Sequence, residues 1–349
     1  MNSKLRMMSA LAGVVICAIL IWGLDTAPKS SYYHNEGHVF GTYYNIRYEA
    51  TEDLEKDIQA AFTEFDNSLS MFNPHSILSA VNANRDTVTN EAFETMWEEA
   101  RRVYELSGGA FDITVAPLVN YWGFGNKKSN SPKDGLIGEA GLTAKRSDSV
   151  SALLEFVGFS KVALADHKVY KFDERVMIDA GAVAKGQACD MIASVLRDHN
   201  CENYLVDIGG EVVCRGHNAQ GEPWHIGITK PNLNNEGAQE DLQEILSVTD
   251  IAMATSGNYR NYYFDGTERR SHTIDPRTGF PVQHSLLSAT VVSSTCMRAD
   301  ALATACMVLG ADEALDMIDR AEDAACYLIV AQNDSLIALT SPNWGEFIK

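Results

Sequence analysis

Residues 204–215, YLVDIGGEVVCR, indicate how the sheet of this chain is built. Residues 204–208 and 212–215 are rich in β-branched and apolar side chains and are predicted as strands, with Gly209-Gly210 between them. Strands of similar composition are predicted further out, at 39–48, 287–293, 327–331 and 336–340, the last two as a closing hairpin. Helices are predicted at 54–69, 90–107 and 298–309. Because these elements are interleaved without regular β-α-β alternation, the sequence favours an α+β fold over a doubly wound parallel sheet.

The chain divides into a short N-terminal segment and one mixed α/β body. Residues 1–31 are predicted as a signal or membrane-anchor segment with its linker, and residues 32–349 as a single domain. Within that domain, the first residues, 32–37, are polar and are expected to form a linker. Polar stretches at 126–134 and 231–241 are predicted as surface loops.

Composition limits the possible functions. The 349 residues can bury a large core, and 46% hydrophobic with 21% charged residues excludes wholesale disorder. The 28 Lys and Arg residues against 47 Asp and Glu give a formal net charge of −19, which repels nucleic acid and anionic lipid. A phosphorylated ligand would therefore need a cation, or local backbone N–H groups, to offset this repulsion.

The N-terminus has the pattern of an export signal or of a single membrane anchor. Lys4 and Arg6 precede an apolar run at 7–24, which is about long enough to span a bilayer, and Asp25 follows at once. The run lacks a clear small-x-small cleavage site, which favours a retained anchor over a cleaved signal. Lipidation of Cys17 is a third possibility, although Cys17 lies in the middle of the run.

The cysteine pattern indicates neither a zinc site nor a redox motif. Outside the N-terminal run the cysteines are Cys189, Cys201, Cys214, Cys296, Cys306 and Cys326. None of them forms C-x-x-C, and no Cys/His spacing suits zinc. Because they lie in apolar runs, buried free thiols are favoured, although an exported protein could form a disulfide.

Residues 178–186, IDAGAVAKG, place an acidic residue and several small residues before a helix. Small residues allow the backbone to approach a ligand closely, and a helix N-terminus offers N–H groups to an anion. An ordinary strand–turn–helix junction would give the same pattern. The segment is no P-loop, since Lys185 precedes the second glycine, and the chain lacks both G-x-G-x-x-G and G-x-S-x-G.

Two further segments could carry chemistry. In residues 298–304, RADALAT, Asp300 and Thr304 are four residues apart and share one helix face, where their oxygens would suit Mg²⁺. The alternative is a purely structural role in which Asp300 caps the helix. His272 precedes a turn at 275–279 and could act as a general base, because histidine titrates near neutrality, but a lone histidine is more often structural.

The order of the motifs resembles that of the ApbE-type FAD:protein FMN transferase family, from about residue 37 to the C-terminus. The motifs are GTY (41–43), SMF (70–72), GAFD (109–112), ID (178–179), AKG (184–186), DIGGE (207–211), ATSGNYR (254–260), HTIDPRTG (272–279) and ADALAT (299–304).

The resemblance implies an extracytoplasmic enzyme of mixed α/β architecture related to the T-fold, held at or near the inner membrane. Members use Mg²⁺ to split the pyrophosphate of their substrate FAD. They join FMN through a phosphoester bond to a Thr or Ser of a partner protein, and AMP leaves. Expected acceptors are subunits of redox complexes of the sodium-pumping quinone reductase or Rnf type, or secreted proteins with an FMN-binding domain.

The resemblance also implies roles for individual residues. The flavin-contacting positions would be Phe40, Phe72, Ala110, Phe111, Asp112, Asp179, Lys185 and Ile274. Metal ligands would be the Ala182 carbonyl, the Asp300 carboxylate and the Thr304 hydroxyl. Some members have an acidic residue where this chain has Ala303, so that ligand is lost here. His272 matches the family's proposed base for the acceptor hydroxyl.

Two other functions would use much of the same machinery. A Mg²⁺-dependent FAD pyrophosphatase would replace the acceptor hydroxyl with water, and a flavin-binding module would hold FAD without chemistry. The binding module would not need both His272 and the Asp300/Thr304 pair. The chain carries no acceptor motif of the type D-x-x-[ST]-G-A-[ST]-x-T, so the acceptor is expected to be a separate protein.

Overall fold

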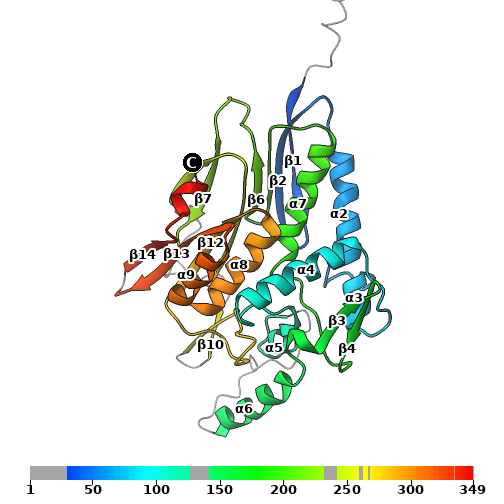
Figure 1. Cartoon of the computed structure of the whole chain (residues 1–349), viewed down its shortest axis with the longest axis vertical. Coiled ribbons are helices and arrows are strands. Elements are labelled where there is room, and N and C mark those ends of the chain that lie inside the picture. Colours follow the sequence, from blue (N-terminus) through cyan, green and yellow to red (C-terminus); the bar gives the residue numbers. More distant parts are fainter. Residues whose placement is uncertain are drawn as a thin grey trace, which may run out of the picture.

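A computed structural model describes residues 30–125, 141–231, 242–258, 262–265, 268–333 and 335–348 of the chain (Figure 1). The predicted anchor at 7–24, the predicted loop at 126–134 and all of the predicted loop at 231–241 except Pro231 lie outside these residues. Among the helices so described, none has the length and apolar character needed to cross a membrane.

The centre of the molecule is an eight-stranded sheet in which each neighbouring pair of strands is antiparallel. In spatial order the strands are β1 (Ser31–Val39), β2 (Thr42–Ala50), β5 (Tyr204–Ile208), β6 (Glu211–Arg215), β9 (Ile251–Gly257), β12 (Leu286–Ser293), β13 (Ala324–Gln332) and β14 (Ser335–Thr340). The antiparallel pairing agrees with the predicted α+β class, and β13 and β14 form the predicted closing hairpin.

Helices cover one face of this sheet and share a single core with it (Figure 1). They are α2 (Glu55–Leu69), α4 (Glu91–Leu106), α7 (Ala184–Asp198), α8 (Cys296–Leu309) and α9 (Ala311–Arg320). The predicted helix ends are confirmed at particular residues: the Asn90 side chain accepts the Phe93 N–H at the start of α4, and α8 ends at Gly310, whose φ is +83°. The six cysteines after residue 29 are buried free thiols, as predicted.

The opposite face of the sheet is covered by a second, smaller unit. Strands β7 (Trp224–Thr229) and β8 (Leu242–Val248) pair with each other and pack, together with α10 (Trp344–Phe347), over β6, β9, β12 and β13. Alternation along a strand explains how both faces are filled: Val212 and Cys214 of β6 contribute to this second core, whereas Val213 contributes to the first.

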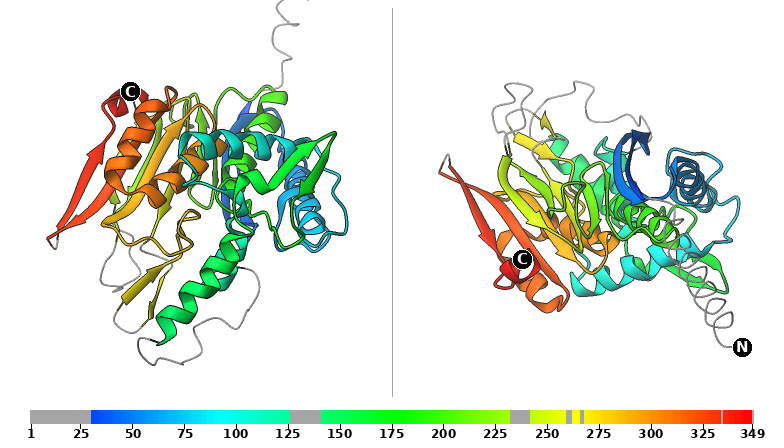
Figure 2. Two further views of the ribbon diagram at one scale, coloured as in Figure 1. Left: turned by 60° about the horizontal axis from the view of Figure 1, so that its bottom comes forward. Right: turned by 90° about the horizontal axis from the view of Figure 1, so that it is seen from above.

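Smaller elements surround one end of the sheet. They are α3 (Ile77–Asn82), η1 (Ile113–Val115), α5 (Ala116–Tyr121), α6 (Gly141–Leu154), η2 (Phe159–Lys161), β3 (Val162–Ala165), β4 (Lys168–Lys171), β10 (Tyr262–Asp265) and β11 (Glu268–Ser271). Figure 2 shows α6 and the β10–β11 hairpin extending from the same side of the molecule.

The sequence prediction was wrong at the start of the domain. Residues 32–37 were expected to be a linker, but they lie in β1, which pairs along its whole length with β2 around the two-residue turn Phe40-Gly41. The strand is polar because it lies at the edge of the sheet, with much of its surface in solvent. Its one buried polar residue, Asn35, accepts a hydrogen bond from the Tyr48 hydroxyl (2.8 Å).

Candidate active site

One cavity of about 1050 Å³ brings most of the predicted site residues together. It is lined by ten of the twelve: Ala110, Phe111, Asp112, Asp179, Ala182, Lys185, His272, Ile274, Asp300 and Thr304. These residues come from four separate segments of the chain, 110–112, 179–185, 272–274 and 300–304, so only the fold places them side by side. The volume is that of a site for a cofactor-sized ligand.

The other two predicted residues, both in the described part of the chain, lie outside the cavity lining. Phe40 occupies the β1–β2 turn with a φ of +52° and packs on Phe62 and Phe65 of α2, with ring centroids 5.7 and 5.3 Å apart. Phe72 is 69% exposed. The placement therefore does not support their predicted flavin contacts.

Sequence neighbours of these two residues line the cavity in their place. They are Met71, beside Phe72, and Tyr43, Asn45 and Arg47, which alternate along β2. The period of two along a strand would have identified this face of β2, but only with the strand boundaries known.

The GAFD stretch is held in place by its own acidic residue. Asp112 Oδ1 accepts hydrogen bonds from the Thr114 N–H (2.8 Å) and hydroxyl (2.6 Å), and Oδ2 accepts from the Phe159 N–H (3.0 Å). Burial raises the pKa of Asp112, while these hydrogen bonds oppose the rise. Since three donors already use its carboxylate, Asp112 fixes the shape of this wall.

The IDAGAVAKG segment crosses the cavity as a turn leading into α7. The Asn82 side chain makes the two backbone hydrogen bonds to Ile178 that a neighbouring strand would otherwise make. It accepts the Ile178 N–H (2.7 Å) and donates to the Ile178 carbonyl (2.8 Å). Asp179 Oδ1 then accepts the Gly181 N–H (2.7 Å). Asp179 is partly accessible within the cavity but is surrounded by protein, and this burial raises its pKa.

Helices α7 and α8 meet where the cavity is most charged. The Gly186 N–H donates to Asp300 Oδ2 (3.1 Å), and the Lys185 Nζ lies 4.0 Å from the same oxygen. Lys185 also forms an ion pair and hydrogen bond with Glu211 of β6. Burial opposes the charge on Lys185, but Asp300 and Glu211 outweigh it and raise the pKa of Lys185.

Gly186 makes this junction possible. A Cβ at residue 186 would lie 2.3 Å from the carbonyl oxygen of Cys296 and 2.8 Å from the Met297 Cα, so only glycine lets the first turns of α7 and α8 touch. Gly186 therefore serves the close approach of two helices, a role that the sequence analysis did not assign to it.

The N-terminus of α8 is secured from several directions. Thr295 caps the helix by accepting the Arg298 N–H (3.2 Å), so the alternative of capping by Asp300 is wrong. Asp190 of α7 accepts the N–H groups of Cys296 (3.0 Å) and Met297 (2.8 Å).

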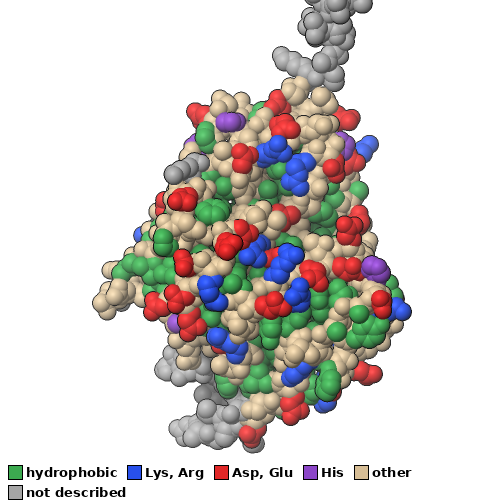
Figure 3. Space-filling model, viewed as in Figure 1, with side chains coloured by type: hydrophobic (Ala, Val, Ile, Leu, Met, Phe, Trp, Pro, Cys, Tyr) green, Lys and Arg blue, Asp and Glu red, His purple; other side chains and the backbone are tan. Residues whose placement is uncertain are grey.

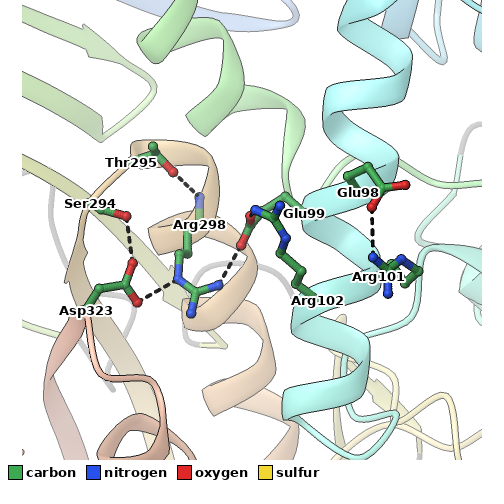
Figure 4. Close-up of polar contacts among 8 residues, drawn as sticks. All are labelled: Glu98, Glu99, Arg101, Arg102, Ser294, Thr295, Arg298 and Asp323. Atoms are coloured by element: carbon green, nitrogen blue, oxygen red, sulfur yellow. Dashed lines mark hydrogen bonds and ion pairs between the residues drawn. The ribbon is translucent and has the colours of Figure 1, made fainter.

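A charged network on the outer side completes this support. The face in Figure 3 carries Lys and Arg side chains over α4 and α8, interspersed with Asp and Glu. Figure 4 shows that Arg298 bridges Glu99 of α4 (2.8 Å) and Asp323, before β13 (2.9 Å). Glu99 is buried, so this ion pair fixes the rotation of α8 and the direction of Asp300.

The next turn of α8 contributes Thr304. Its hydroxyl lies 3.2 Å from the Ser256 hydroxyl of β9, within the cavity lining. Ala303, where the family resemblance implied the loss of an acidic ligand, is fully buried in the core on a face of α8 that packs against the protein. Asp300 and Thr304 share the cavity face, as their spacing predicted.

His272 lines the same cavity from the segment that follows β11. Its ring lies edge-on to Phe124, with centroids 6.2 Å apart. The predicted turn after it is present: the Gly279 N–H donates to the Asp275 carbonyl (2.8 Å), and the Trp122 indole N–H donates to the Gly279 carbonyl (2.8 Å). This tie to α5 holds the His272 segment against the cavity.

The charges along the lining are unequal. Its acidic residues are Asp112, Asp179, Asp207, Glu211 and Asp300, and its Lys and Arg residues are Arg47 and Lys185. The excess of carboxylates would repel a phosphate group, so a phosphorylated ligand needs an added cation.

The donor set suits a hard divalent cation. Asp300, Thr304 and Ala182 offer a carboxylate, a hydroxyl and a carbonyl on one cavity, the oxygen ligands that Mg²⁺ takes together with waters and phosphates. Within the described residues, no group of three or more His, Cys, Asp or Glu side chains is placed to hold a metal. A cation bound here would share the oxygens of Asp300, Thr304 and Ala182 with waters and with the phosphates of its ligand.

Comparison with known proteins places this arrangement in a family. The family model for the ApbE family matches residues 40–328, which include every motif named above, from GTY (41–43) to ADALAT (299–304). The chain belongs to the ApbE family. The FAD:protein FMN transferase of Haemophilus influenzae is 31% identical over 96% of this chain and 97% of its own length. The enzyme of the same name from Vibrio cholerae is 33% identical over 90% of this chain and 92% of its own length.

Solved structures of ApbE proteins agree with the fold. Flavin transferase ApbE from Vibrio cholerae superposes with a TM-score of 0.78, at 31% identity, covering 91% of this chain and 100% of that one. The apo form of the flavinyl transferase ApbE from Pseudomonas stutzeri gives a TM-score of 0.77 at 26% identity, covering 91% of this chain and 97% of that one. The mixed α/β architecture of this chain is therefore that of ApbE structures.

Sequence reasoning missed several residues of the site. Glu211 was noted only as part of the DIGGE motif, yet it holds Lys185. Asp190 and Gly186 position α8, and no local pattern identifies them, because their partners lie more than 100 residues away in the chain.

Proposed function

We propose that this ApbE-family chain is a FAD:protein FMN transferase that uses Mg²⁺. It cleaves the pyrophosphate of FAD, attaches FMN to a Thr or Ser hydroxyl of a separate acceptor flavoprotein, and releases AMP. Family membership and the relatives' names support this activity. The observation that carries it is the single cavity in which His272, the Asp300/Thr304 pair and the GAFD wall meet.

The reaction breaks the phosphoanhydride bond of the FAD pyrophosphate and forms a phosphoester bond to the acceptor. The acceptor oxygen forms a bond to the phosphorus of the FMN half, the bond from that phosphorus to the bridging oxygen breaks, and AMP leaves with the bridging oxygen. Such transfers depend on positioning and on neutralising charge more than on covalent chemistry by the protein. Mg²⁺, when bound, supplies that neutralisation at the pyrophosphate.

The protein's own residues have separable tasks in this scheme. His272 accepts the proton of the acceptor hydroxyl as the oxygen–phosphorus bond forms. Asp300, Thr304 and the Ala182 carbonyl hold the cation at the end of α8, and Lys185 adds a fixed positive charge beside them. Ala110, Phe111, Asp112 and Ile274 line the cavity and would contact the flavin.

We further propose that the enzyme works at the extracytoplasmic face of the inner membrane, held by residues 7–24. The apolar run, its preceding basic residues and the poor cleavage site support a retained anchor. Acceptors would then be membrane redox-complex subunits or secreted FMN-binding domains. Cell fractionation tests this: release of protein beginning near Asp25 by osmotic shock would show cleavage, and a diacylglyceryl group on Cys17 would show lipidation.

Turnover of FAD with and without an acceptor tests the activity. The protein, FAD and Mg²⁺ are incubated with an FMN-domain protein of the same organism or with buffer alone, and FAD, FMN and AMP are separated by chromatography. A transferase releases AMP in step with the amount of acceptor, and free FMN stays low. Equal FMN and AMP without acceptor would indicate a pyrophosphatase, and intact FAD throughout would indicate a binding module.

A further inference from the structure

The junction of α7, α8 and β6 contains a lysine placed against two carboxylates. Lys185 pairs with Glu211 on one side and lies 4.0 Å from Asp300 Oδ2 on the other. Its side chain is about one-third exposed, whereas those of Glu211 and Asp300 are only 3% exposed. The ammonium group therefore occupies the boundary between two buried acids and the cavity.

The buried carboxylate of Glu211 stabilises the ammonium group of Lys185 at this position. Its Oε2 is buried, and within the described part of the chain it has no hydrogen-bond partner. A buried carboxylate without a counter-charge is costly, so the ion pair with Lys185 is what makes a charged Glu211 tolerable at this position. Glu211 thus anchors the ammonium group beside Asp300.

We propose that Lys185 is a built-in cation that shares the Asp300 carboxylate with the divalent cation and so sets the affinity of the site for that cation. Like charges at a separation of a few ångströms repel strongly in a partly buried site. Lys185 therefore weakens divalent binding, and the site retains one fixed positive charge when the exchangeable cation is absent. This inference deepens the proposed function, because it rests on Asp300 as the cation ligand.

Two consequences follow for the enzyme. Metal-free protein does not carry two bare carboxylates at the junction, so the cavity keeps its shape before the cation arrives. A weakened cation site also favours joint binding of the cation with a phosphorylated ligand. Lys185 neutralises part of the negative charge of Asp300, and the phosphates of the ligand replace that charge. Lys185 is a residue that tunes the site, distinct from the ligands themselves.

Binding of Mn²⁺ alone, followed by electron paramagnetic resonance at fixed pH, tests the proposal without FAD or acceptor. Lys185→Gln should bind Mn²⁺ about tenfold more tightly or better, in line with the effect of one nearby charge on a carboxylate. Lys168→Gln is the matched control: it removes the same charge from an exposed position in β4, outside the cavity lining, and should bind Mn²⁺ as wild type does. Unchanged or weaker binding by folded Lys185→Gln would overturn the proposal.

A second pair of variants covers the case in which Lys185→Gln fails to fold because Glu211 is left without a counter-charge. The double variant Lys185→Gln/Glu211→Gln removes both charges of the pair and is compared with Glu211→Gln alone. The proposal expects the double variant to bind Mn²⁺ about tenfold more tightly than Glu211→Gln. Equal affinities would contradict it.

Asp300→Ala separates this inference from the proposed function. Loss of Mn²⁺ binding in this variant is expected, and retained binding would remove Asp300 as the shared carboxylate and with it the proposal. Transfer of FMN by the wild-type protein is measured independently. If wild-type protein transfers FMN and Lys185→Gln has unchanged Mn²⁺ affinity, the role of Lys185 is refuted while the proposed function stands.

Discussion

Gly186→Ala should push α7 and α8 apart where they meet beside Asp300, the proposed cation ligand. The new Cβ would lie 2.3 Å from the Cys296 carbonyl oxygen, whereas real Cβ atoms essentially never come within 3.0 Å of another atom. Relieving the contact requires a movement of at least about 0.7 Å in a close-packed region. Both partners are helix backbone, so no side chain can turn away to make room.

The expected cost follows from three effects. Overpacking of a core costs about 1–3 kcal/mol, and the movement also weakens the hydrogen bond from the residue 186 N–H to Asp300, a charge-assisted bond of about 1.5–3 kcal/mol. Alanine in place of glycine inside a helix returns about 1 kcal/mol. The free energy of unfolding should therefore fall by about 2–4 kcal/mol.

Urea denaturation followed by circular dichroism measures this, with Gly345→Ala as the control. Gly345 lies in α10 and has open space around its Cβ position, so its substitution should be neutral or should stabilise by up to about 1 kcal/mol. Mn²⁺ affinity should fall in Gly186→Ala and remain unchanged in Gly345→Ala. A Gly186→Ala protein as stable as wild type with unaltered Mn²⁺ affinity would refute the account of this helix contact.

Three further perturbations test other parts of the site. Asp300→Ala should abolish Mg²⁺-dependent turnover while weakening FAD binding only moderately, because the cation acts mainly on transition-state charge; full turnover at ordinary Mg²⁺ concentrations would contradict the ligand assignment. His272→Ala should slow FMN transfer by about 10²–10⁴-fold with FAD affinity and melting temperature nearly unchanged, whereas a structural histidine would alter all three together. Burial raises the pKa of Asp190 to about 6, so folded protein holds a proton between about pH 4 and 6 that unfolded protein releases, and the associated stability is lost as pH rises through about 6. Wild type should accordingly lose about 2 kcal/mol relative to Asp190→Asn between pH 4 and 7 in urea titrations, and a constant difference would argue against a buried, titrating Asp190.

Local chemistry determined most of the elements that the sequence predicted. Helices α4 and α8 begin at an Asn and a Thr that cap them, and α8 ends at a glycine with positive φ. These signals lie within a few residues of one another, so a sequence displays them directly. The same holds for the Asp300/Thr304 pair, whose spacing alone places both side chains on one face.

The misplaced elements depend on distant partners. β1 is polar and was expected to be a linker, but its register with β2 and the buried Asn35–Tyr48 hydrogen bond make it a strand. At the start of the IDAGAVAKG segment, the Asn82 side chain, 96 residues away in the sequence, makes both hydrogen bonds to the backbone of Ile178. A polar edge strand, or a hydrogen bond from a distant side chain, produces almost no local pattern of hydrophobic residues.

In the site, too, local patterns predicted some features, and others depend on contacts between distant segments. Spacing suggested a cation pair, and motif order suggested a shared pocket, but neither indicated that Glu211 holds Lys185 or that Gly186 serves a helix contact. Both facts arise where α7, α8 and β6 meet, and they depend on three segments separated in sequence. The flavin contacts of Phe40 and Phe72 stay predictions that rest on motif position alone, because both residues lie outside the cavity lining.

The intact mass of an acceptor protein tests the central claim most directly. An FMN-domain acceptor from the same organism is incubated with the enzyme, FAD and Mg²⁺, denatured to remove bound flavin, and weighed by mass spectrometry alongside an acceptor whose attachment Thr or Ser is replaced by Val or Ala. The account predicts a gain equal to FMN less water on the intact acceptor, and none on the substituted one. An unmodified acceptor in the presence of enzyme that has bound or hydrolysed FAD would contradict it.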